Sequence, residues 1–120
     1  MLDPADRLAL IEIVDCTGRV ADYLKGFDRA AFLADRKTCD AVTMQVFVVA
    51  EAANRLGDPA KPLLGEVDWR QIRGVRNRIA HGYGSVDFGI IWEIARADMP
   101  DLESRARAAL GNDPDMPPAR

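Results

Sequence analysis

Apolar residues recur along most of this chain at spacings of three and four residues, which is the pattern of amphipathic helices. No segment shows the strict alternation of apolar and polar residues that is typical of a half-buried strand. The first apolar stripe follows a strong helix start, because Asp3 can cap the helix and Pro4 occupies its first position. The stripe comprises Leu10, Ile11, Val14, Gly18, Ala21 and Leu24, and Gly26 provides the stop.

Two further helices are predicted in the first half of the chain. Asp28 is placed to cap a short helix that runs through Leu33. A longer helix should cover residues 36–56 and end at Gly57, and its wide apolar stripe indicates burial on more than one side. The segment 58–62 is predicted to be a loop, because its two prolines cannot occupy a helix interior.

The second half of the chain predicts more helices. Asp68 can cap a helix that Gly82 ends. The apolar positions of this helix are Trp69, Ile72, Val75 and Ile79. Asp87 opens a fifth helix, which Pro100 is expected to interrupt, and residues 102–110 can form a last short helix.

These elements predict an all-α fold, an antiparallel bundle of four to five helices. With 120 residues, 48% of them hydrophobic and 29% charged, the chain has the size and composition of one globular domain. We assign that domain to residues 1–110. The segment 111–120 is rich in proline and polar residues, and we predict that it is a disordered tail.

Composition also indicates where the protein resides. The longest apolar run, residues 46–50, is far shorter than the roughly 20 residues of a membrane span, and the first residues lack the features of a secretory signal. The two cysteines, Cys16 and Cys39, fit neither a metal spacing nor a disulfide framework, and both fall within helical patterns as small buried thiols. We therefore expect a cytoplasmic protein that has no membrane partner.

Residues 69–83 concentrate the unusual chemistry of the chain. They hold its only histidine, one of its two tyrosines, no acidic residue and four arginines, namely Arg70, Arg73, Arg76 and Arg78. Removing these arginines leaves 12 basic against 19 acidic residues, a balance of −7 compared with −3 for the whole chain. A local basic strip on an acidic body suits a confined phosphate site. A solvated helix face is the alternative that charge alone leaves open.

The available side chains suit one kind of catalysis without a metal or cofactor. One histidine and no paired cysteines cannot build a zinc site, and no glycine-rich phosphate loop opens a helix. His81 could transfer protons, and an arginine could stabilise the anionic transition state of phosphoryl transfer. Together they suffice for RNA cleavage through the ribose 2′-hydroxyl. A purely structural role for a lone histidine at a helix end is the alternative reading.

The spacing of Arg76 and His81 adds a geometric constraint. Residues five apart on a regular helix lie about 140° apart around its axis, so these two do not share a face. The helix break at Gly82 could let His81 leave the regular path. Alternatively, two copies of the helix could pack across a twofold axis and pool their side chains in one site.

The same residues carry a family resemblance. Residues 76–83 match Arg-x4-His-x-Tyr, and they resemble the signature of the HepT-like toxins of the HEPN superfamily. Several other segments follow the pattern of that family in the same order, so the resemblance covers roughly residues 5 to 110. These segments are residues 23–26, Phe32, residues 51–55, residues 69–72, Trp92 and residues 99–100.

The resemblance implies a HEPN-like bundle that dimerises through the motif-bearing helix, with a ribonuclease site at the interface. It implies that Arg76 and His81 are the catalytic pair and that Asn77 is a positioning group. Arg73 and Arg78, which belong to the same basic strip, are candidate supporting residues. Such toxins belong to type VII toxin–antitoxin modules, in which a minimal nucleotidyltransferase antitoxin transfers AMP to the tyrosine of the motif. That tyrosine is Tyr83 in this sequence, and the substrate would be RNA (tRNA or mRNA).

Two alternatives remain open on the sequence. Glu51 lies four residues before Arg55, which would make a surface ion pair on one helix, but the pattern of the family suggests instead that Glu51 orients an arginine near the site. At the level of function, the alternative to an RNA-cleaving toxin is a non-catalytic dimeric domain that binds a nucleotidyltransferase or a nucleotide.

Overall fold

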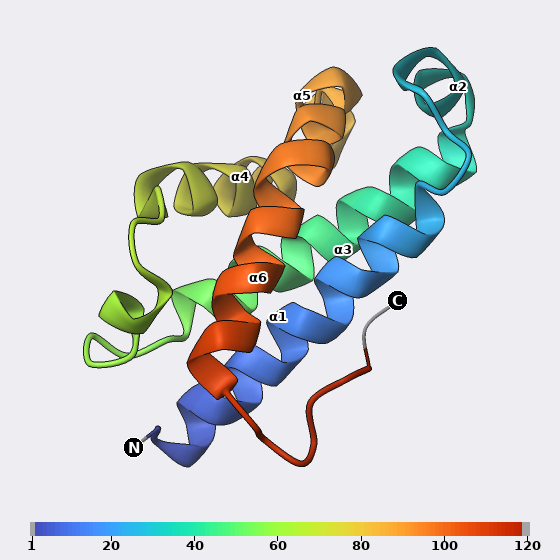
Figure 1. The fold of residues 1–120 in the computed structure, drawn as a ribbon. Helices are drawn as coiled ribbons and strands as arrows, with labels where there is room; N and C mark the ends of the chain where they lie inside the picture. The colour runs from blue at the N-terminus through green and yellow to red at the C-terminus, as the bar shows by residue number, and fades with distance from the viewer. Residues whose placement is uncertain (1, 119–120) are drawn as a thin grey trace.

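The computed structural model describes residues 2–118, and within that range the chain is helical, with no strand (Figure 1). The all-α fold class is therefore confirmed. In chain order the elements are α1 (Pro4–Tyr23), α2 (Arg29–Ala34), α3 (Arg36–Asn54), η1 (Lys61–Leu64), α4 (Trp69–His81), η2 (Tyr83–Ser85), α5 (Phe88–Glu93), η3 (Ile94–Asp98) and α6 (Met99–Leu110). The long helix α1 packs against α3 and α6 and runs antiparallel to both. None of the helices described is long and apolar enough to span a membrane.

Aspartate caps set the helix starts, because each carboxylate accepts a backbone N–H that lacks a partner within the helix. Asp3 accepts from the amide of the second helical residue at 2.8 Å, and Asp28 accepts from the amide of the third at 2.8 Å. Asp68 and Asp87 cap α4 and α5 in the same way. All four predicted caps are thus confirmed, and Asp35 adds a fifth, at the start of α3.

The predicted interruption at Pro100 is wrong. The chain stays helical from Phe88 to Leu110, because the η3 segment forms a π-helical turn just before the proline. In this wider turn the amide of Met99 donates to the carbonyl of Ile94, five residues back. Proline lacks an N–H and clashes with the carbonyl four residues before it in a regular helix, and a π turn absorbs that mismatch. Pro62 likewise lies inside the short 3-10 helix η1, and so the predicted loop is partly helical.

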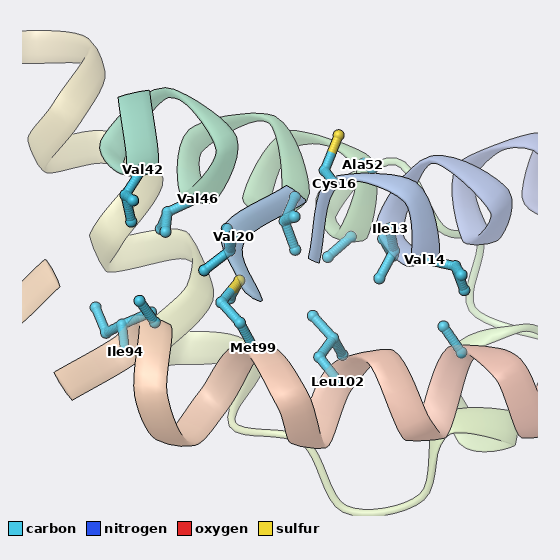
Figure 2. Packing of buried hydrophobic residues seen from close by; sticks show 14 of the residues in the cluster. Ile13, Val14, Cys16, Val20, Val42, Val46, Ala52, Ile94, Met99 and Leu102 are labelled. Atoms are coloured by element: carbon cyan, nitrogen blue, oxygen red, sulfur yellow. The ribbon is translucent and has the colours of Figure 1, made fainter. Parts of the chain in front are cut away.

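The core lies where α1, α3 and the η3–α6 rod meet (Figure 2). Trp92 is buried and packs on Phe32 with ring centroids 5.3 Å apart, so it is a core residue. The two cysteines are free and buried, as predicted, and burial raises the pKa of both thiols. Side chains that fill the core in Figure 2 are Ile13, Val14 and Val20 of α1, Val42, Val46 and Ala52 of α3, Ile94 of η3, and Met99 and Leu102 of α6.

The segment after α6 returns along α1. Arg7 donates to both carboxylate oxygens of Asp113, at 2.6 and 2.8 Å, and Arg107 donates to the carbonyl of Pro117 at 2.9 Å. The prediction of a disordered tail over residues 111–120 did not anticipate these contacts, of which the one between Arg7 and Asp113 joins positions 106 residues apart. Residues 119–120 lie outside the described part of the chain.

Candidate active site on α4

Helix α4 is a peripheral helix that packs on α3, and none of its residues is fully buried (Figure 1). Its four large apolar residues, Trp69, Ile72, Val75 and Ile79, are half-buried against the core. Arg70, Arg73 and Arg78 are exposed, as are Asn77 and His81. The basic strip predicted from the sequence therefore lies on one accessible helix.

Arg76 differs from the other arginines of α4 because it is anchored across the helix interface. Its Nε donates to Oε1 of Glu51 on α3, and its Nη1 donates to Oδ1 of Asn77 at 3.3 Å. The side chains of Arg76 and Glu51 are 35% and 32% exposed, so the pair sits at the edge of the solvent. A guanidinium has five N–H donors, and those not used here remain available to a phosphate.

The position of Glu51 settles one alternative from the sequence. Arg55 pairs with Glu12 of α1 at 3.0 Å, while Glu51 pairs with Arg76. Glu51 therefore does not pair with Arg55, which was one of the two alternatives that the sequence left open. Glu51 instead contacts Arg76, an arginine of the motif, as the pattern of the family suggests.

His81 is the last residue of α4, and its side chain is exposed. The amide of Gly82 still donates to the carbonyl of Arg78 at 3.1 Å, so the helix keeps its regular path through His81. The suggestion that His81 bends away at Gly82 is therefore wrong. On a regular helix Arg76 and His81 lie about 140° apart around the axis and about 7.5 Å apart along it. His81 instead shares a face with Asn77, four residues earlier.

Tyr83 follows in the single turn η2 and reaches back to α3. Its hydroxyl donates to Oδ1 of Asp40, which also accepts from Nε of Arg36 at 2.9 Å. The tyrosine ring meets Phe88 edge-on at 6.4 Å, and the guanidinium of Arg36 lies 5.0 Å from the centre of the same Phe88 ring. The Tyr83 side chain nevertheless remains 38% exposed.

The surroundings of Tyr83 and Asp40 shift the pKa values of these two groups in opposite directions. Partial burial, together with the hydrogen bond to Asp40, raises the pKa of Tyr83 above its ordinary value. The hydrogen bonds from Tyr83 and Arg36 lower the pKa of Asp40. Near neutral pH the cluster therefore consists of a neutral phenol donating to an ionised carboxylate.

Asp40 and Arg36 were not identified as site residues from the sequence. Their spacing of four residues on one helix would be interpreted as an ordinary surface ion pair. Only the tertiary contact between α3 and η2 reveals their connection to the motif.

Apolar grooves flank α4 on both sides. One lies between α4 and α5, and another between α3 and the end of α4. They include the exposed side chains of Ile90 and Met44, which are 46% and 57% accessible. Residues 2–118 contain no group of three or more histidine, cysteine or acidic side chains placed to hold a metal ion.

Comparison with known proteins identifies the family. A family model described as "Ribonuclease HepT-like" matches residues 13–109, which includes α4 and most of the bundle. The chain belongs to the HepT-like ribonuclease family. The resemblance inferred from the Arg-x4-His-x-Tyr motif is thus confirmed, and the matched range contains Arg76, His81 and Tyr83.

Several curated relatives of this HepT-like chain carry ribonuclease names. "Probable ribonuclease HepT" of Thermococcus cleftensis is 26% identical over 96 residues, covering 80% of this chain and 87% of that protein. A provisionally named RNase of Caldanaerobacter subterraneus subsp. tengcongensis is 28% identical over 89 residues, covering 74% and 80%. Another, from Methanocaldococcus jannaschii, is 23% identical over 94 residues, covering 78% and 86%. No solved structure matches the chain.

Proposed function

We propose that this HepT-like chain is a metal-independent endoribonuclease whose active site forms between two copies of α4. The proposal rests on the contacts and the exposure of the two residues of the Arg-x4-His motif. Arg76 donates a hydrogen bond to Glu51, His81 is exposed, and both Arg76 and His81 belong to one accessible helix in a chain of a ribonuclease family.

The chemistry follows from the two side chains. A neutral imidazole of His81 would take the proton from a ribose 2′-hydroxyl as its oxygen attacks the adjacent phosphorus. Arg76 would stabilise the negative charge on the pentavalent phosphorus, and Asn77 would hold the arginine in place. The 5′-oxygen then leaves and takes a proton from a protonated imidazole. Base and acid are two roles, and two copies would supply two imidazoles.

The surface of α4 supports the pairing. A single copy turns Arg76 and His81 to different faces, because the helix is regular to its end. The apolar residues of α4 are only half-buried, and the grooves beside it contain exposed Ile90 and Met44. Apolar surface of this kind at the edge of a site is typical of an interface. Packing of a second α4 here would bring the histidine of one copy towards the arginine of the other.

We further propose that the chain is the toxin of a type VII toxin–antitoxin module. Its antitoxin would be a minimal nucleotidyltransferase that adenylylates Tyr83. The phenol is accessible and follows His81 by two residues, which makes it a suitable acceptor beside the site. An attached AMP would bring bulk and a negative charge to the arginines that bind RNA, so modification would switch the site off.

RNA cleavage by purified, unmodified protein in the presence of EDTA tests the activity. His81→Ala and Arg76→Ala should each abolish cleavage of tRNA and mRNA and relieve growth arrest on expression. Arg19→Ala is the matched control, because Arg19 forms an exposed ion pair with Asp15 on α1, far from the motif. It should cleave like the wild type.

A second candidate function is a non-catalytic dimeric domain that binds a nucleotidyltransferase. The exposed apolar residues beside α4 favour it as much as they favour a dimer. Unmodified wild-type protein that leaves both RNAs intact and still binds the nucleotidyltransferase would replace the ribonuclease proposal by this one.

A further inference from the structure

The hydroxyl of Tyr83 has a carboxylate in direct contact. It donates to Oδ1 of Asp40, which projects from α3 and reaches η2 across the groove beside Met44 and Ile79. The contact joins residues 43 positions apart in the sequence, so it is produced by the fold and not by local geometry. Arg36 donates to the same oxygen at 2.9 Å and helps to hold the carboxylate in place.

Adenylylation of a tyrosine requires that the phenol lose a proton. The phenolic oxygen forms a bond to the α-phosphorus of ATP, the bond from that phosphorus to the bridging oxygen breaks, and pyrophosphate leaves. The surroundings of Tyr83 raise its pKa, so the phenolate is not formed in advance near neutral pH. A group that accepts the proton during the attack is therefore needed.

We propose that Asp40 is that proton acceptor, so that this chain supplies the base for its own modification. The inference rests on the proposed adenylylation of Tyr83. The proton passes from the Tyr83 hydroxyl to Oδ1 of Asp40 as the new oxygen–phosphorus bond forms, and it then leaves to solvent. A carboxylate hydrogen-bonded to the attacking hydroxyl plays this role in protein kinases.

Arg36 has a supporting role in this arrangement. Its hydrogen bond and charge help to lower the pKa of Asp40, so the carboxylate is ionised near neutral pH and is held beside the Tyr83 hydroxyl. Its guanidinium also packs over Phe88, the ring that contacts Tyr83. Arg36 is therefore a positioning residue, and Asp40 touches the reacting atom.

A purely structural role is the rival explanation, in which Asp40 only holds η2 against α3. Asp40→Asn separates the two, because an asparagine oxygen can still accept the hydrogen bond from Tyr83 but cannot take up the proton. Asp40→Glu retains the carboxylate at a changed distance. Asp101→Asn is the matched control, since Asp101 forms an exposed ion pair with Arg105 at 2.9 Å, also four residues away on one helix.

The experiment follows the intact mass of the full-length chain with a cognate minimal nucleotidyltransferase, ATP and Mg²⁺. Wild type and Asp101→Asn should gain an adenylyl group at the same rate, and Tyr83→Phe should gain none. Asp40→Asn should react about a hundredfold more slowly, and Asp40→Glu should recover part of the rate. Thermal melting of each variant checks that the fold is retained.

The pH profile gives a readout that a structural role would not change. Without the base, the reaction depends on phenolate already present, so the rate of Asp40→Asn should rise by up to tenfold per pH unit between about pH 7.5 and about pH 9. The wild-type rate should rise less. The charged or titratable groups that interact electrostatically with this contact are Arg36 and Cys39 on α3. On the neighbouring α5, Gly89 lies against Arg29 of α2 and Asp87, and His81 precedes Tyr83 by two residues in the sequence.

Each outcome bears on a different claim. Equal rates and equal pH profiles for Asp40→Asn and wild type, with Tyr83→Phe unmodified, would overturn the role of Asp40 and leave the proposed function standing. No modification of the wild type, or continued modification of Tyr83→Phe, would overturn adenylylation of Tyr83 itself and the role of Asp40 with it.

Discussion

Loss of the ion pair between Arg76 and Glu51 should reduce RNA cleavage much more than it reduces stability. Glu51→Gln removes the negative charge and keeps the shape of the side chain. Both partners are about one third exposed, so solvent screens the pair and its loss should reduce the free energy of unfolding by less than about 1 kcal/mol. The melting temperature should then fall by no more than about 4 °C.

The effect on RNA cleavage should be larger. Arg76 would lose the contact that fixes its Nε, and a misplacement of about 1 Å at a reacting centre costs up to about a hundredfold in rate. We expect the cleavage rate to fall by about 10- to 100-fold, which corresponds to about 1.4 to 2.7 kcal/mol in the transition state. Single-turnover cleavage of a defined RNA and a thermal melt of the same samples measure the two effects.

Glu12→Gln is the control for this prediction. Glu12 also pairs with an arginine across a helix interface, Arg55 at 3.0 Å, but this pair is remote from the motif. It should show a similar or smaller loss of stability with unchanged cleavage. If Glu51→Gln cleaves as fast as Glu12→Gln while Arg76→Ala is inactive, Glu51 does not orient the catalytic arginine and the reasoning is refuted.

Two further predictions concern the helices themselves. Gly74→Ala should raise the free energy of unfolding by about 0.5 to 1 kcal/mol, because a Cβ there meets nothing within 4 Å and alanine favours a helix interior. Denaturant titrations measure the change, and the reverse substitution at an exposed helical position, Ala21→Gly, should lower the free energy of unfolding by a similar amount. A loss of stability in Gly74→Ala would contradict this prediction. Cys16 and Cys39 should resist alkylation by iodoacetamide in the native protein, as measured by intact mass, and rapid labelling without unfolding would show that they are not buried. Burial raises the pKa of both thiols in the folded protein, so the same thiols ionise at a lower pH in the unfolded chain. Their contribution to the free energy of unfolding should therefore be lost as the pH rises above about 8.5.

Local sequence signals predicted most of the fold. The aspartate caps at Asp3, Asp28, Asp68 and Asp87 act within three residues, and the apolar stripes report which side of each helix is buried. The prediction at Pro100 failed for a tertiary reason. The helix is held by core packing of Ile94, Met99 and Leu102 and accommodates the proline through a π turn.

The site was only partly predictable for the same reason. The motif residues could be found from spacing and family pattern, but the partners of Arg76 and Tyr83 lie on α3, 25 and 43 positions away. Spacing on one helix allowed Glu51 to pair with Arg55, but Arg55 pairs instead with Glu12 of α1. Contacts between helices decide these choices, and a one-dimensional pattern does not contain them.

The proposed active site is composite and needs two copies of α4. The most direct measurement is the rate of RNA cleavage per chain over a wide range of protein concentration, with the molecular mass measured on the same samples. We predict that the rate per chain rises with concentration as dimer forms and then levels off, while His81→Ala is inactive throughout. A constant rate per chain in samples whose mass is that of a monomer would show that one copy of α4 is sufficient and would overturn the composite site.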